Sequence, residues 1–363
     1  MRLGIIGLPQ SGKTTTFSAL TGDAAPVAAS SGYGQETHVA VVKVPDERLD
    51  RLSAMFSPRK TTPASVEYTD FPGVGFGSRD KSEAAWVGTL RTVDALVQVV
   101  RTFEEESVPH EGPLDPPAQA EQVQLELIVS DLAIVERRLQ RLEADLKRTR
   151  LGERAQIEAE MALLRRLQGQ LEAGKPLRDL ELTPEESRSI RGFQFLSEKP
   201  VLLVLNVGED QLGRAADLEA ALTAAYPHRK TAVASLCAKL EQELLQLSAE
   251  DARTFMEDLG IVELAAGKLI RRSYELTGLI SFFTVGEDEV RAWPIPRGTP
   301  ASQAAGVIHT DLERGFIRAE VVTYVDLVAS GGMAEARQRG LLRQEGRNYV
   351  VADGDIMHVL FSR

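Results

Sequence analysis

The chain has 363 residues, enough for two or three domains, and its 43% hydrophobic and 26% charged residues are typical of a globular protein with a substantial core. Its 42 basic and 53 acidic residues give a formal charge of −11, which argues against a protein that coats nucleic acid non-specifically. A single cysteine excludes an intrachain disulfide and a zinc site built on cysteine pairs. No apolar run approaches the roughly 20 residues of a membrane helix, and the N-terminus does not resemble a signal peptide. We therefore expect a cytoplasmic protein that makes no membrane contact.

The first element is an apolar strand at residues 3–7, followed by a phosphate-loop motif. Gly7 to Thr14 fits G-x-x-x-x-G-K-[ST] in full, and a helix is predicted from Thr14 to about Leu20. In such a loop, backbone N–H groups and the helix N-terminus surround the phosphates, Lys13 neutralises the β- and γ-phosphates, and the Thr14 hydroxyl ligates Mg²⁺. The residues predicted to bind the phosphates are Gly7, Gln10, Ser11, Gly12, Lys13, Thr14 and Thr15.

A second motif follows a predicted strand at residues 64–70. The strand ends in Asp70-Phe71-Pro72-Gly73, a D-x-x-G sequence. Its Asp holds Mg²⁺, usually through water, and its Gly N–H meets the γ-phosphate. By itself D-x-x-G is common in surface turns, but the upstream phosphate loop favours the functional interpretation. Lys13, Asp70 and Gly73 are therefore the predicted catalytic residues.

A third motif is predicted to read the base. The buried strand at residues 201–205 leads into Asn206-Val207-Gly208-Glu209, where GTPases carry N-K-x-D. A glutamate is longer than the aspartate that pairs with guanine, and an unmatched polar site loses affinity, so adenine is favoured over guanine. A simple strand-end turn is the alternative. The predicted base contacts are Asn206, Val207 and Glu209, with Ser235, Leu236 and Cys237 from a loop after a strand at residues 231–233.

Residues 118–182 carry two amphipathic helical patterns separated by a turn near Gly152, which predict an inserted antiparallel hairpin. The apolar positions are Ile128, Leu132, Val135, Leu139, Leu142 and Leu146, then Ile157, Met161, Leu164, Leu167 and Leu171. Arginines also cover this segment, among them Arg137, Arg138, Arg141, Arg165 and Arg166. Because glutamates are interleaved, one interpretation is a solvated face with ion pairs, and the other is a contact surface for RNA or a partner.

From Leu279 the pattern changes to short strand-like runs at residues 279–285, 289–295, 315–322 and 349–351. These predict a separate α+β domain over residues 279–363. The predicted fold class is thus an α/β P-loop NTPase domain over residues 1–117 and 183–278, with the helical hairpin at 118–182 and the small C-terminal domain.

These motifs together resemble the Obg-like ATPase family of P-loop translation-factor GTPases, in its YchF type. The resemblance includes the phosphate loop, V-P-D-E-R-L-D at 44–50, D-F-P-G, and the C-terminal runs V-R-A-W-P-I-P-R-G-T at 290–299 and D-G-D-I-M-H at 353–358. It implies a β-grasp (TGS) C-terminal domain and a Mg²⁺-dependent switch that hydrolyses ATP, or GTP, slowly. It also implies association with ribosomes or another part of the translation machinery, through the hairpin or the C-terminal domain. Val74, where many GTPases carry a catalytic Gln, agrees with slow hydrolysis.

Two segments depart from the family. In the phosphate loop, Gln10, Ser11 and Thr14 replace Asn, Val and Ser, and because that Asn is associated with a monovalent-cation site, potassium activation is doubtful. The family Thr of the first switch has no counterpart in register, and Thr37 is assigned to the metal site as the nearest hydroxyl. Two alternatives stay open: a GTP-preferring switch of the same fold, and a ribosome- or RNA-binding adaptor with structural nucleotide binding and negligible turnover. The sequence gives no indication of the oligomeric state.

Overall fold

The computed structural model describes residues 1–22, 27–30, 36–71, 81–105, 108, 110, 114–148, 154–261 and 263–362, with the main chain alone for 27–30, 36–37, 81–85 and 249. By its contacts the chain divides into two compact units. The first comprises Met1–Val41 and Glu67–Leu269, and the second comprises Val42–Val66 and Ile270–Arg363. Each unit has its own sheet.

The first unit is built on a seven-stranded sheet with the strand order β2-β3-β5-β1-β6-β7-β8. The strands are β1 (Arg2–Gly7), β2 (Val27–Ser30), β3 (Glu36–Lys43), β5 (Ser65–Asp70), β6 (Ala95–Arg101), β7 (Val201–Asn206) and β8 (Thr231–Leu236). The pairs from β5 across β1, β6 and β7 to β8 are parallel, and the edge pair β2–β3 is antiparallel. Every residue of β6 and β7 is buried, because helices cover both faces of a parallel sheet.

The helices of this unit are α1 (Lys13–Thr21), α3 (Lys81–Arg91), α4 (Pro116–Leu146), α5 (Arg154–Glu172), α6 (Pro184–Ile190), α7 (Ala215–Ala225), α8 (Ala238–Leu244) and α9 (Ala249–Asp258). Short 3₁₀ turns lie at η2 (Leu177–Asp179), η3 (Arg191–Phe193) and η4 (Glu209–Arg214). The helix α10 (Ala265–Leu276) crosses the boundary between the units. The predicted strand–loop–helix start of the chain is confirmed by β1 and α1.

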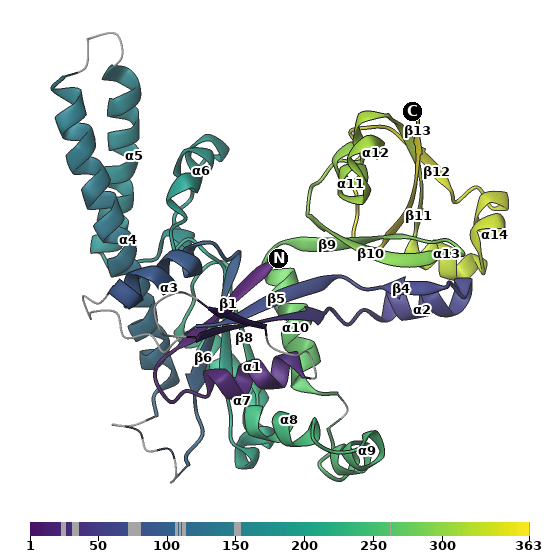
Figure 1. Cartoon of the computed structure of the whole chain (residues 1–363), viewed down its shortest axis with the longest axis horizontal. Coiled ribbons are helices and arrows are strands. Elements are labelled where there is room, and N and C mark those ends of the chain that lie inside the picture. Colours follow the sequence, from purple (N-terminus) through teal and green to yellow (C-terminus); the bar gives the residue numbers. More distant parts are fainter. Residues whose placement is uncertain are drawn as a thin grey trace. The chain divides into compact units, whose positions relative to one another are not determined.

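The inserted hairpin is confirmed, with α4 and α5 running side by side (Figure 1). The helix α4 begins where Asp115 accepts a hydrogen bond from the Ala118 N–H at 3.1 Å, with prolines in its first turn. The predicted apolar positions form one core: eight of them, from Ile128 to Leu171, are buried, and Leu132, Leu146 and Ile157 are partly buried against these. The heptad pattern therefore buries one face of each helix against the other, because only that face is apolar.

The second unit contains a six-stranded sheet with the strand order β12-β11-β13-β9-β10-β4. Its strands are β4 (Lys60–Thr62), β9 (Leu279–Thr284), β10 (Glu289–Pro296), β11 (Phe316–Thr323), β12 (Arg343–Glu345) and β13 (Asp355–Phe361). Its helices are α2 (Glu47–Phe56), α11 (Ala301–Ile308), α12 (Thr310–Arg314), α13 (Tyr324–Ser330) and α14 (Met333–Gln338). A core that includes Ile280, Phe282 and Ile295 lies between the sheet and α11.

Two features of this unit differ from the prediction. Residues 42–66 and 270–278, which the predicted boundaries place in the nucleotide-binding domain, have most of their contacts in the second unit. The reason is that β4 pairs in parallel with β10 and that Arg48 of α2 pairs with Asp353 at 2.8 Å. The strand predicted at 349–351 is wrong, because Val350 makes only an isolated bridge to Pro300, and β12 and β13 flank it instead. Among the helices that the structure describes, none combines the length and hydrophobicity that a bilayer crossing requires.

Candidate nucleotide-binding site

The phosphate loop lies at the carboxyl ends of neighbouring parallel strands. β1 leads into the loop, β5 ends at Asp70 beside it, and β7 ends at Asn206. A crevice at this edge of an open α/β sheet is where ligands bind in such folds. The topology therefore brings all three sequence motifs to one edge.

The loop turns sharply before α1. Gln10 has a left-handed backbone with φ of 60°, and Gly12 follows with φ of 88°. Lys13 begins α1 and folds back so that its Nζ donates to the Leu8 carbonyl at 2.8 Å. Burial lowers the pKa of Lys13, while the charge of Asp70 opposes that shift. A buried ammonium whose described partners are a carbonyl and the charge of a nearby carboxylate is suited to an anionic ligand.

The Asn206 side chain connects the phosphate loop to the first residue of α8 through two hydrogen bonds. Its Nδ2 donates to the Ser11 carbonyl at 3.1 Å, and its Oδ1 accepts from the Ala238 N–H at 3.2 Å. Both polar atoms of the amide thus hold the backbone in place. Gly12 passes so close to this amide that a Cβ would overlap the Asn206 Nδ2.

Gly12→Ala is expected to weaken nucleotide binding at least tenfold. The new methyl group requires both a strained positive φ and displacement of the Asn206 amide, so the loop loses its conformation. Fluorescence titration with a labelled nucleotide measures the loss. Gly88→Ala on α3 is the matched control, because no described atom lies within 4 Å of a Cβ there. Equal affinity of Gly12→Ala and wild type would contradict the role of this close approach.

Asp70 and Thr14 form the candidate magnesium site. The Thr14 hydroxyl donates to Asp70 Oδ2 at 3.0 Å, whereas the buried Asp70 Oδ1 has no hydrogen-bond partner among the described residues. Burial raises the pKa of Asp70, and the Thr14 hydrogen bond and the Lys13 charge oppose the shift. A hard cation with oxygen ligands fits this pair, because it would satisfy the orphaned carboxylate oxygen. In the part of the chain that the structure describes there is no cluster of three or more His, Cys, Asp or Glu side chains that could hold a metal ion.

A cavity of about 620 Å³ lies next to the loop, and several of the residues predicted to contact the nucleotide line it. Of the predicted residues, its lining includes Gly12, Thr15, Asn206, Val207, Glu209 and Cys237. Burial raises the pKa of the Cys237 thiol, which agrees with a packed rather than reactive cysteine. Sequence reasoning missed Phe103, Lys239 and Gln242, which also line it. A signal for Phe103 was its position two residues after the end of the buried strand β6.

The other two predicted base contacts, Ser235 and Leu236, are not part of the lining of this cavity. The reason is that β8 continues to Leu236, so both residues belong to a strand and not to a loop. Ser235 donates from its N–H and from its hydroxyl to Glu219 of α7, at 2.8 and 2.6 Å. Leu236 is buried in the core.

Two predicted positions lie outside the described residues, and a third is described in its main chain alone. Gly73 and Val74 fall outside the described residues, and Thr37 has a described main chain, paired with Ala29 across β2 and β3, but no described side chain. Their roles at the γ-phosphate and the metal stay predictions.

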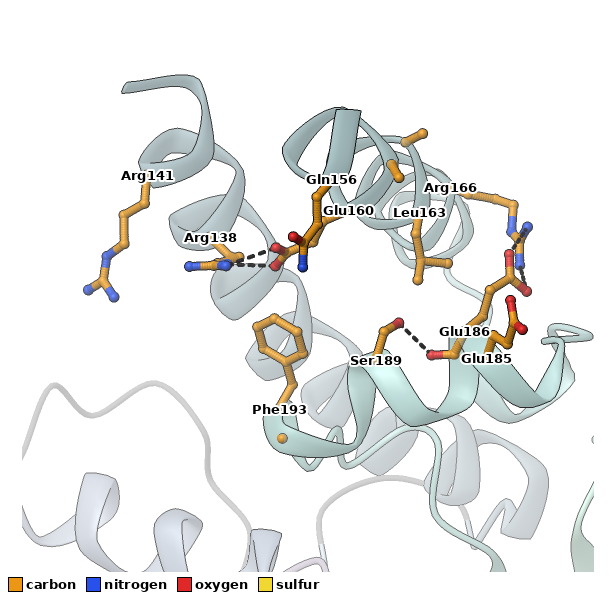
Figure 2. Close-up of a pocket in the computed structure, with 13 residues that line it drawn as sticks. Arg138, Arg141, Gln156, Glu160, Leu163, Arg166, Glu185, Glu186, Ser189 and Phe193 are labelled. Carbon is orange, nitrogen blue, oxygen red and sulfur yellow. Dashed lines mark hydrogen bonds and ion pairs between the residues drawn. The ribbon is translucent and has the colours of Figure 1, made fainter. Parts of the chain in front are cut away.

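A second cavity, of about 1030 Å³, lies where α4, α5 and η3 meet α6 (Figure 2). Arg138 pairs with Glu160 at 2.7 Å and Arg166 pairs with Glu186 at 2.8 Å on its walls. Arginines and glutamates balance around it, and its described lining comes from helices rather than from a glycine-rich loop. The cavity beside the phosphate loop is therefore the better nucleotide site despite its smaller volume. For these arginines, the structure favours the ion-paired face over an open basic surface.

Comparison with known proteins agrees with this geometry. Residues 2–140 match the family model described as a 50S ribosome-binding GTPase, and residues 279–362 match the YchF-GTPase C-terminal model, described as a protein of unknown function. The chain is 40% identical to the ribosome-binding ATPase YchF of Bacillus subtilis, over 99% of this chain and 98% of the relative. It is 36% identical to the ribosome-binding ATPase YchF of Escherichia coli O157:H7, over 99% of each chain. The solved Schizosaccharomyces pombe YchF GTPase superposes with a TM-score of 0.85 at 30% identity, over 99% of this chain and 97% of that one.

The parallel sheet, the phosphate loop and the acidic end of the adjacent strand define a P-loop NTPase of the G-domain class, with a helical insertion and a C-terminal β domain. This confirms the predicted fold class. The chain belongs to the YchF family, as the full-length identities show. The predicted family resemblance is thereby confirmed.

Proposed function

We propose that the chain is a nucleotide-dependent switch that binds and slowly hydrolyses ATP with Mg²⁺ and associates with ribosomes from the cytoplasm. The observation that carries the proposal is the hydrogen bond between Thr14 and Asp70 near the Lys13 ammonium. Lys13 and Thr14 belong to a complete phosphate-loop motif, and Asp70 ends the neighbouring strand. Relatives that are 36 to 40% identical over their full length are named ribosome-binding ATPases. The hairpin and the C-terminal domain are the candidate ribosome contacts.

In this proposal each residue has a separate task. The loop N–H groups and Lys13 hold the β- and γ-phosphates, and Thr14 and Asp70 hold Mg²⁺, which when bound neutralises charge on the phosphate oxygens. Gly73 reports the γ-phosphate through its N–H. Val74 has no group that could orient an attacking water, so turnover is slow unless a partner supplies one.

The proposed preference for ATP rests on the base pocket. Val207 is buried and apolar, both polar atoms of the Asn206 side chain are used in holding the loop and α8, and Glu209 stands where a guanine-binding Asp would be. The motif at this pocket thus lacks the short acid that pairs with guanine's two N–H groups. A GTP-preferring switch is the alternative within the same fold.

Side-by-side competition titrations with fluorescent ATP and GTP analogues test this preference. We expect ATP to bind at least tenfold more tightly, about 1.4 kcal/mol. The double variant Val207→Lys, Glu209→Asp recreates N-K-x-D and is expected to shift the ratio towards GTP. A GTP preference in the wild type would overturn the base assignment while leaving the phosphate site intact. Single-turnover phosphate release no faster than without protein would favour the adaptor with structural nucleotide binding.

A further inference from the structure

Arg101 is a buried cation next to the phosphate loop that none of the sequence motifs contains. It is the last residue of β6, and only 3% of its surface is exposed. All three guanidinium nitrogens donate to main-chain carbonyls: Nη1 to Gln10 at 3.3 Å, Nε to Phe103 at 3.1 Å and Nη2 to Val108 at 2.6 Å. A planar fork with several fixed donors can hold three carbonyls at once, which a lysine ammonium on a flexible chain does not reproduce.

All three carbonyls belong to residues of the nucleotide site: Gln10 lies in the phosphate loop, and Phe103 and Val108 line the cavity beside it. Gln10 is the phosphate-loop residue with a left-handed backbone, a conformation that a non-glycine residue keeps only when its surroundings enforce it. Phe103 lines the base pocket, and the guanidinium carbon of Arg101 lies 4.3 Å from the centre of its ring. One side chain therefore contacts both the phosphate-binding and the base-binding halves of the site.

The backbone of Arg101 is itself fixed from the hairpin. Gln119 of α4 accepts from the Arg101 N–H at 3.0 Å and donates to the Arg101 carbonyl at 2.9 Å, as a neighbouring strand would. Because the main chain is fixed on both polar atoms, the side chain reaches the loop from a rigid base.

We propose that Arg101 is a positioning residue for the nucleotide: it holds Gln10 in the conformation that turns the loop N–H groups towards the phosphates, and it holds Phe103 at the base pocket. This inference rests on the proposed nucleotide binding. In this role Arg101 makes no contact with the nucleotide and takes no part in proton transfer.

The test compares Arg101→Met and Arg101→Lys with the wild type in stopped-flow dissociation of a fluorescent ADP analogue and in steady-state ATP hydrolysis. We expect dissociation at least tenfold faster and a KM for ATP raised by a similar factor, with kcat changed less than threefold. The lysine variant keeps the charge but loses the fork, so it is expected to stay within threefold of the methionine variant. Full rescue by lysine would overturn the positioning role in favour of charge alone.

Arg178 provides the matched control for a purely structural effect. It is equally buried in the same unit, donates to Gln124 and to the Tyr226 hydroxyl, and is not among the residues that line the nucleotide cavity. Arg178→Met, or Arg178→Lys if the first does not fold, should lower the melting temperature while dissociation stays within twofold of wild type. Equal acceleration in the Arg178 and Arg101 variants, or wild-type dissociation in both Arg101 variants, would overturn the inference. A wild type that binds no nucleotide would instead overturn the proposed function.

Discussion

Lys13→Ala is expected to reduce ATP affinity at least 100-fold, about 2.7 kcal/mol. The Lys13 ammonium is buried, its pKa is lowered by that burial, and among the described residues its hydrogen-bond partner is the Leu8 carbonyl. Phosphates would give this charge an anionic partner, and charge-assisted hydrogen bonds in a site shielded from water are strong. Isothermal titration calorimetry with ATP and Mg²⁺ measures the loss.

Lys199→Ala is the matched control for this variant. Lys199 is also partly buried with a pKa lowered by burial, and its Nζ donates to the Val93 carbonyl at 2.6 Å, but it does not belong to the phosphate loop. Its replacement should leave ATP affinity within twofold of wild type. An ATP affinity of Lys13→Ala within threefold of wild type would show that this loop is not the phosphate-binding site.

The second large effect concerns stability. Asp131→Asn is expected to lower the free energy of unfolding by about 3–5 kcal/mol, because the largely buried Arg91 side chain loses its charged partner and an amide NH₂ takes the place of a buried acceptor oxygen. Asp131 is fully buried on α4, pairs with Arg91 of α3 at 2.7 Å, and accepts from the Leu196 and Ser197 N–H groups at 3.0 and 2.7 Å. This carboxylate thus fastens the base of the hairpin to α3 and to the segment that leads into β7. Urea denaturation followed by circular dichroism measures the change.

The control for this prediction is an exposed pair on the same hairpin. Glu143 and Arg165 lie 3.6 Å apart, with more than half of each side chain exposed. Glu143→Gln should cost less than about 1 kcal/mol, because solvent screens such pairs. A loss of similar size in both variants would show that burial is not what makes Asp131 important.

Local patterns predicted the parts of the fold that depend on neighbours in the chain. The phosphate loop is one continuous stretch from Gly7 to Thr14, and the hairpin depends on spacings of three and four residues, so both could be found without any tertiary contact. The start of α6 at Thr183 also depends only on nearby residues, because the Thr183 hydroxyl accepts from the Glu186 N–H and the Glu186 carboxylate accepts from the Thr183 N–H.

Long-range contacts decided the rest of the site. The position at which β8 ends is fixed by its pairing with β7, which continues to Asn206–Leu236. Because of this pairing, Ser235 and Leu236 belong to the strand and not to the predicted loop. No sequence motif contains Arg101. Its guanidinium donates to the carbonyls of Gln10, Phe103 and Val108, and only the folded chain places these three groups together.

The amino-acid sequence by itself determined the class of this protein: a phosphate-loop motif, an acidic strand end, a base-reading motif altered at Val207 and Glu209, a heptad hairpin and a separate C-terminal domain. Only the tertiary structure decided which backbone groups hold the loop and to which unit residues 42–66 belong, since β4 pairs with β10, which lies far later in the chain. The physical reason is the same in each case. Helical periodicity and loop motifs are set by nearby residues, whereas strand pairing and buried polar contacts satisfy hydrogen-bonding groups across long distances in sequence.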